Sequence, residues 1–261
     1  MNFLIKKYRD FKQDAKQKLV STKLFDQRLL ISKWLDSKNI KNYTITDNLI
    51  INVQGNVDIS SVISRATSAM GRPTIDKELQ IDEIPFQFGS VSGDFNCSYN
   101  KLVSFKGCPE YVGGRFDASY NQIDTFEFFP KFVGSEISLH YNNLNSLKFF
   151  PHDFLSETNS AIYFSYNKIF DLRYMPYKFF SRIFFYKNPI DKIIELISPR
   201  SLQSTYENNK RKLLYKYMVE YEPIIGNKIY LDKFKDVIYM IDMKDFDFNQ
   251  IYQLEDYKII D

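Results

Sequence analysis

The sequence predicts an α/β repeat fold: a solenoid of short strands stacked into a parallel sheet, with helical caps at both ends. Three observations lead to this prediction. A short motif recurs at nearly constant spacing through the middle of the chain, a proline accompanies most of its copies, and the pattern stops on both sides. A fixed period of about 20 to 50 residues is typical of solenoids.

The repeated motif is clearest at Phe95-x-Cys97-x-x-Asn100-x-Leu102. Its five copies align on the residues Asn100, Asn121, Asn142, Asn167 and Asn188, which are 21, 21, 25 and 21 residues apart. Apolar and polar residues alternate at the start of each copy, which indicates a short strand with one buried face. We expect each asparagine to close its strand and to pair through its amide with backbone groups of neighbouring copies, a structural role.

Composition indicates a folded chain without a strong charge preference. Of 261 residues, 44% are apolar, which is enough for a buried core. The 35 basic and 32 acidic side chains leave a net charge of only +3, so the overall charge does not indicate binding to nucleic acid. Cys97 and Cys108 occupy apolar positions, so we expect buried thiols. No apolar run approaches the roughly 20 residues of a membrane helix, and the start of the chain does not resemble a secretory signal. These features predict a cytoplasmic protein.

The segments outside the repeats divide the chain into four parts. Residues 1–40 are predicted to form one or two amphipathic helices, with one apolar stripe from Ile5 to Leu19 and a second made of Leu29, Leu30, Trp34 and Leu35. The first stripe lies in a strongly basic stretch, which either packs on the repeats or on a partner, or binds an acidic partner or anionic surface. Residues 41–78 are predicted as a hairpin cap over 42–59 followed by an inserted loop with a helical turn at 62–70.

The repeats are predicted to cover residues 79–197, and residues 198–261 to form a helical carboxy-terminal cap. Within this cap we expect a short strand at Lys228–Tyr230 and a helix from Leu231 to Met243.

Residues two apart on a strand share a face of the sheet. Outward-facing residues at the same position in successive copies therefore form columns that run across the strands. The first column holds Asp94, Arg115, Glu136, Ala161 and Arg182, which predicts a cross-strand ladder of charges. The second holds Asn96, Asp117, Ser138, Tyr163 and Phe184. The third holds Ser98, Ser119, His140, Ser165 and Tyr186. A fourth holds Tyr99, Tyr120, Tyr141 and Tyr166, which we expect to be a structural stack.

This face is small and polar at its amino-terminal end and aromatic at the other. Exposed aromatic side chains are typical of binding hot spots, so we predict a protein-binding site at Tyr163, Phe184 and Tyr186, with His140 and Arg182 beside them. The alternative is that the carboxy-terminal segment folds over these side chains.

The motif resembles the leucine-rich repeat, whose core is L-x-x-L-x-L-x-x-N-x-L, over roughly residues 79–197. More narrowly, SYNKLVSFKGCPEYVGGRFDASYNQI resembles the short asparagine- and proline-containing repeats of uncharacterised bacteriophage and large-virus proteins. The resemblance implies an arc with a parallel sheet on its concave side, used for protein–protein binding, and implies no catalytic residues or cofactor. Aromatic residues often replace leucine here, and the fourth copy carries a four-residue insertion around residues 156–160.

Three functions are open to such a chain. The first is a non-enzymatic scaffold, encoded by a phage or virus, that binds a viral or host protein through the concave face. The second is a structural component of a virus particle, held by the basic segment from Phe3 to Leu19. The third is an enzyme with a site in the 60–78 loop that depends on Arg65 or Arg72. Neither His140 nor His152 has the neighbours of a known catalytic or metal-binding motif, which favours a non-enzymatic role.

Overall fold

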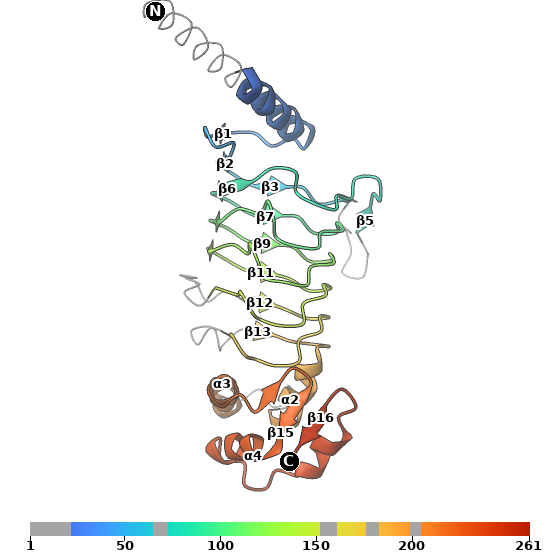
Figure 1. Ribbon diagram of the computed structural model, residues 1–261, viewed down its shortest axis with the longest axis vertical. Helices are drawn as coiled ribbons and strands as arrows, with labels where there is room; N and C mark the ends of the chain where they lie inside the picture. Colours follow the sequence, from blue (N-terminus) through green and yellow to red (C-terminus); the bar gives the residue numbers. More distant parts are fainter. Residues whose placement is uncertain (1–21, 65–72, 152–160, 176–182, 199–204) are drawn as a thin grey trace, which may run out of the picture.

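The chain is an α/β protein built from parallel sheets of many short strands. The computed structural model describes residues 22–64, 73–151, 161–175, 183–198 and 205–261. The strands stack along the long axis of an elongated molecule, with the helix at residues 22–37 at one end and the carboxy-terminal helices at the other (Figure 1).

A six-stranded parallel sheet runs through the stack in the order β13-β12-β11-β9-β7-β3. Its strands are β3 (Val57–Asp58), β7 (Phe95–Asn96), β9 (Phe116–Asp117), β11 (Ile137–Ser138), β12 (Ile162–Tyr163) and β13 (Ile183–Phe184). The register places the first apolar residue of each copy beside that of the next, as at Phe95 and Phe116. Each copy of the motif therefore begins with one strand of this sheet.

A second sheet, which the sequence did not predict, has five strands in the order β1-β2-β6-β8-β10. These are β1 (Tyr43–Ile45), β2 (Ile51–Val53), β6 (Phe88–Val91), β8 (Tyr111–Val112) and β10 (Phe132–Val133). Glycine corners link the two sheets. A Cβ atom on Gly113 would lie 2.2 Å from the carbonyl oxygen of Ser92, and one on Gly134 would lie 2.2 Å from that of Gly113. Only glycine therefore allows successive corners to stack this closely.

The hairpin predicted over residues 42–59 is correct only for β1 and β2, which pair antiparallel. β2 and β3 instead pair parallel with β6 and β7, so residues 54–56 form a corner between the two sheets. This stretch is an additional copy of the repeat, earlier than the first recognisable motif. The sequence pattern did not reveal it because Val62 stands where the later copies have asparagine.

The inserted segment contains two short strands in the part that the structure describes. β4 (Val62–Ser64) and β5 (Thr74–Ile75) pair antiparallel. The helical turn predicted at residues 62–70 is therefore wrong at its start, where the β-branched side chains of Val62 and Ile63 favour a strand. Arg65 and Arg72 lie outside the described residues.

Aromatic rings fill much of the core between the sheets. Phe95 and Phe116 stack with their ring centroids 5.9 Å apart, and the rings of Phe164 and Phe185 are 5.4 Å apart. Cys97 and Cys108 are buried free thiols, as predicted. A hydrogen bond to the Cys108 thiol, together with burial, raises the pKa of Cys97 well above its ordinary value.

The carboxy-terminal part combines helices with a three-stranded sheet, whereas the sequence predicted a helical cap with one short strand. Its elements are α2 (Pro189–Ile197), α3 (Thr205–Tyr221), β14 (Ile224–Ile225), β15 (Lys228–Tyr230), α4 (Leu231–Met240), η2 (Phe248–Gln253) and β16 (Lys258–Ile260). The predicted strand at Lys228–Tyr230 and the predicted helix from Leu231 are both present. Hydrogen bonds dock this part on the last repeats: Gly226 N–H donates to Asp171 Oδ2 at 2.6 Å, Tyr257 Oη donates to the Phe170 carbonyl at 2.7 Å, and Ile190 N–H donates to the Ile169 carbonyl at 3.1 Å.

The amino-terminal helix is described from residue 22. Residues 22–37 are helical, and of the second predicted stripe Leu35 is buried and Trp34 is partly buried. Leu29 and Leu30 are exposed, so this stripe is wrong at its start, and Ile31, which it left out, is buried instead. The first predicted stripe, from Ile5 to Leu19, lies outside the described residues.

Candidate interaction surface

Asparagine side chains fix the end of each strand in the six-stranded sheet. Asn142 shows the pattern: its Oδ1 accepts from Ile123 N–H at 3.0 Å, and its Nδ2 donates to the carbonyls of Ala118 at 2.9 Å and Leu139 at 3.2 Å. Two of these partners belong to the preceding copy. The same set of bonds recurs at Asn100, Asn121, Asn167 and Asn188. The asparagines thus satisfy buried backbone groups and hold neighbouring strands in register.

A stack of tyrosines borders the outward face of this sheet. The ring centroids of Tyr99 and Tyr120 are 4.2 Å apart, those of Tyr120 and Tyr141 are 4.4 Å apart, and those of Tyr141 and Tyr166 are 4.2 Å apart. All four residues adopt left-handed backbone angles, with φ between 55° and 58°. That conformation is unfavourable for a bulky side chain, and the contacts between rings offset its cost. The predicted structural stack is therefore present.

Charged side chains occupy the amino-terminal half of the face. Arg115 Nε lies 3.3 Å from Glu136 Oε1, and Arg115 Nη2 lies 3.2 Å from Asp117 Oδ2. Asp94 departs from the predicted ladder, because its Oδ1 accepts from the backbone N–H of Arg115 at 2.8 Å. This carboxylate therefore caps a backbone group of the next copy.

Three serines that were predicted to be displayed on the face are buried: Ser98, Ser119 and Ser138. The first two hydroxyls donate to the side chain two residues earlier, Ser98 to Asn96 Oδ1 at 2.7 Å and Ser119 to Asp117 Oδ1 at 2.6 Å. These short side chains turn back on their own strand ends, so they are unavailable to a partner.

The carboxy-terminal end of the face carries exposed aromatic rings. Tyr163 and Phe184 stack with centroids 4.9 Å apart and planes 8° from parallel, and Tyr186 meets Tyr166 edge-on at 5.5 Å. Phe184 is 43% exposed and Tyr186 is 41% exposed, whereas Tyr163 is half-buried. We call these four residues the aromatic face. The described part of the carboxy-terminal segment does not bury Phe184 or Tyr186.

Two further residues were predicted for the binding site, His140 and Arg182, and the structure describes only His140. His140 lies between the charged half and the aromatic face, with its Nδ1 3.3 Å from Ser138 Oγ and its ring edge-on to Tyr120 at 5.3 Å. Burial lowers the pKa of His140 from 6.5. Arg182 lies outside the described residues.

Hollows flank the face at both ends. One of about 400 Å³ is lined by Asp58, Asp94 and Asp117 from the sheet and by Val62 and Pro73 from the inserted segment. The other, of about 590 Å³, is bounded by Tyr186 and by residues of α2. Within the described ranges, no group of three His, Cys, Asp or Glu side chains is arranged to hold a metal ion.

A second row of exposed aromatic residues was missed by the sequence reasoning. Phe128, Phe149 and Tyr174 are exposed and have φ between 63° and 69°, at the position that Gly107 occupies in an earlier copy with φ 87°. Each stands two residues before a proline, and this spacing is the signal that could have revealed the row.

Comparison with known proteins adds no relative: no family model, curated protein or solved structure gives a significant match to this chain. In the part of the chain that the structure describes, no helix has both the length and the apolar character needed to cross a membrane.

Proposed function

We propose that this protein is a non-enzymatic binding scaffold, a leucine-rich-repeat-like solenoid that engages a protein partner through the outward face of its six-stranded sheet. The observation that carries the proposal is the aromatic face at the end of this sheet. We further propose that this side is the concave side of an arc and that the protein is encoded by a phage or virus, following the resemblance of its motif.

The aromatic face has the properties of a binding hot spot. Exposed aromatic side chains that are gathered at one place mark interaction sites, because large rings gain the most when a partner removes them from water. The stack between Tyr163 and Phe184 holds both rings in place, so little side-chain freedom is lost on binding. The asparagine ladder and the sheet beneath give these rings a rigid base.

The experiment compares capture of proteins from the native host by the tagged wild-type chain and by a Tyr163→Ala/Phe184→Ala/Tyr186→Ala variant. The matched control is Tyr111→Ala/Phe132→Ala, which removes a stacked pair of rings 4.6 Å apart on the five-stranded sheet. We expect a protein that is enriched by the wild type and the control but lost with the triple variant. Equal capture by all three would show that the aromatic face is not the binding site.

A structural role in a virus particle is the second candidate function. The observation that favours it is the helix at residues 22–37, whose Phe25, Leu29 and Leu30 are exposed. This function predicts that the protein copurifies with intact particles and that deletion of residues 1–20 releases it. The binding scaffold alone predicts a location in the host cytoplasm and absence from purified particles.

A further inference from the structure

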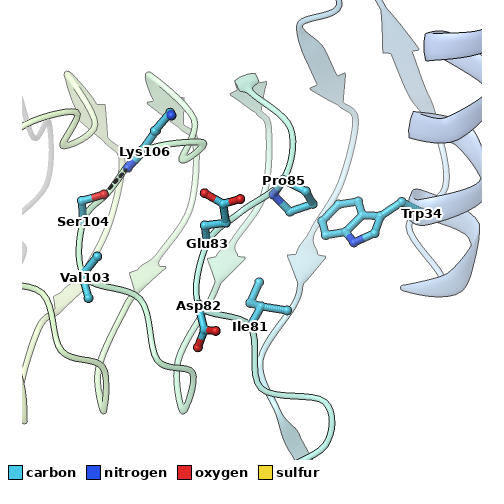
Figure 2. A pocket seen from close by; sticks show the side chains of 8 residues that line it. All are labelled: Trp34, Ile81, Asp82, Glu83, Pro85, Val103, Ser104 and Lys106. Carbon is cyan, nitrogen blue, oxygen red and sulfur yellow. Dashed lines mark hydrogen bonds between the residues drawn. The ribbon is translucent and has the colours of Figure 1, made fainter.

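A hollow of about 570 Å³ lies where the amino-terminal helix meets the first repeats. Figure 2 shows that its walls come from Trp34 on the helix, from Ile81 and Pro85 on the segment before β6, and from Val103 on the next copy. Trp34 makes an edge-on contact with Phe86, with ring centroids 5.7 Å apart, which holds the indole in place. It is nevertheless only partly buried, so the hollow has a rigid aromatic wall that solvent and a ligand can reach.

Two carboxylates line the same hollow. Asp82 and Glu83 are both exposed, and within the described part of the chain neither makes a hydrogen bond or an ion pair. Exposed carboxylates elsewhere on the repeats do find cations, as Glu110 does with Lys131 at 2.7 Å. Lys106 stands on the rim of the hollow and supplies one positive charge against the two negative ones.

We propose that this hollow binds a lysine or arginine side chain from a basic segment of a partner protein. A cation over the indole of Trp34 is attracted by the ring's electron-rich face. The Glu83 carboxylate, which lies at the level of Pro85 and Trp34 in Figure 2, supplies a charge-assisted hydrogen bond for the same group, and the Asp82 carboxylate, which points the other way, adds its negative charge to the hollow. Ile81, Pro85 and Val103 give apolar surface to the aliphatic stem that both lysine and arginine carry.

This combination of walls selects the occupant by its chemistry. A metal ion would gain no binding energy from the indole and the aliphatic wall, and an acidic segment would be repelled by the two carboxylates. An uncharged apolar side chain would leave both carboxylates without a partner and would gain nothing from them. The hollow shares no residue with the aromatic face, so this proposal can be tested independently of the proposed function.

Trp34 is the only tryptophan in the chain, so its fluorescence reports directly on this hollow when tyrosine is not excited. The full-length protein is titrated at low salt with a blocked tetra-arginine peptide and, separately, with the uncharged tetra-citrulline peptide of the same shape. We expect a saturable change in Trp34 emission with tetra-arginine that weakens as salt is added, and none with tetra-citrulline.

Charge variants identify the groups responsible. Asp82→Asn/Glu83→Gln should weaken binding of tetra-arginine about tenfold, because each exposed ion pair contributes up to about fivefold in affinity. Lys106→Ala should strengthen binding about twofold to fivefold by removing the opposing charge. The matched control is Glu127→Gln, which neutralises an exposed carboxylate two copies further along the chain.

Three results would overturn the inference: no saturable change with tetra-arginine, an equal response to tetra-citrulline, or equal affinities for the wild type and the double variant. The substituted side chains are exposed and unpartnered, so all variants should keep the wild-type unfolding midpoint, and this midpoint is measured alongside. Should the double variant nevertheless be destabilised, the gain expected for Lys106→Ala still tests the charge preference.

Discussion

Replacing Asn142 with alanine should remove much of the protein's stability. The asparagine is 7% exposed, and its loss leaves the N–H of Ile123 without its partner. The carbonyls of Ala118 and Leu139 each lose the Asn142 amide but keep another donor, the amide of Asn121 and of Asn167 respectively. An orphaned buried polar group costs about 1 to 3 kcal/mol, and each of the other two hydrogen bonds contributes about 0.5 to 1.5 kcal/mol. We therefore expect a loss of about 2 to 4 kcal/mol, a large share of the total stability of a typical domain, about 5 to 15 kcal/mol.

Urea unfolding followed by circular dichroism measures this loss. We expect the midpoint for Asn142→Ala to fall by about 1 M or more. The neighbouring Asn143→Ala is the matched control, because the Asn143 side chain is partly exposed, donates to the Gln122 carbonyl at 3.4 Å and accepts from the Lys168 ammonium at 2.9 Å. Its cost should stay below about 1 kcal/mol. Similar midpoints for the two variants would refute the role given to the asparagine ladder.

Three further predictions concern the corner, the histidine and the thiols. Gly113→Ala forces a Cβ atom against the Ser92 carbonyl and should cost about 1 to 3 kcal/mol in urea unfolding, whereas Ser135→Ala, at a corner that already carries a side chain, should be neutral. Burial lowers the pKa of His140 below 6.5 despite the nearby Asp117 and Glu136, and Arg115 lowers it further. As pH falls, His140 is therefore protonated in the unfolded chain at a higher pH than in the folded protein, so the free energy of unfolding should decrease below about pH 6.5. His140→Gln should reduce this decrease, and an unchanged dependence of stability on pH would contradict the burial effect. Because Cys97 and Cys108 are buried and the pKa of Cys97 is raised, both thiols should react with Ellman's reagent only after unfolding, and rapid reaction of the native protein would show that the core is open.

The repeat was predictable because its residues are under strong local demands. One asparagine per copy must satisfy buried backbone groups, and one alternating apolar pair must fill the core, so the same letters recur and reveal the stacked strands. The inward and outward sides followed from the alternation, which is why the stack of Tyr99, Tyr120, Tyr141 and Tyr166 could be placed correctly.

The missed features depend on backbone geometry that the alternation does not encode. The five-stranded sheet consists of very short strands next to glycine corners, where close approach of Gly113 to Ser92 matters more than side-chain pattern. The earliest copy was hidden because Val62 replaces its asparagine and the inserted segment follows. Ser98 and Ser119 were wrongly predicted to be exposed, because the alternation of a strand does not reveal that a serine hydroxyl bonds to the side chain two residues earlier.

The candidate site was predictable only in part for a related reason. The aromatic end of the face follows from the columns, since Phe184 and Tyr186 fall at outward positions. The hollow beside Trp34 could not be predicted, because it forms between a helix and two repeats that are far apart in the sequence. Nothing in the spacing of Asp82 and Glu83 indicates that they line one hollow with an indole.

Binding through the aromatic face is tested most directly by measuring affinity for the captured partner once it is purified. Calorimetric titration of that partner should show a loss of at least about 30-fold for Tyr163→Ala/Phe184→Ala/Tyr186→Ala, the equivalent of one hot-spot residue of about 2 kcal/mol. Tyr111→Ala/Phe132→Ala should bind like the wild type. Equal affinity of the triple variant and the wild type, with both folded, would contradict the central proposal.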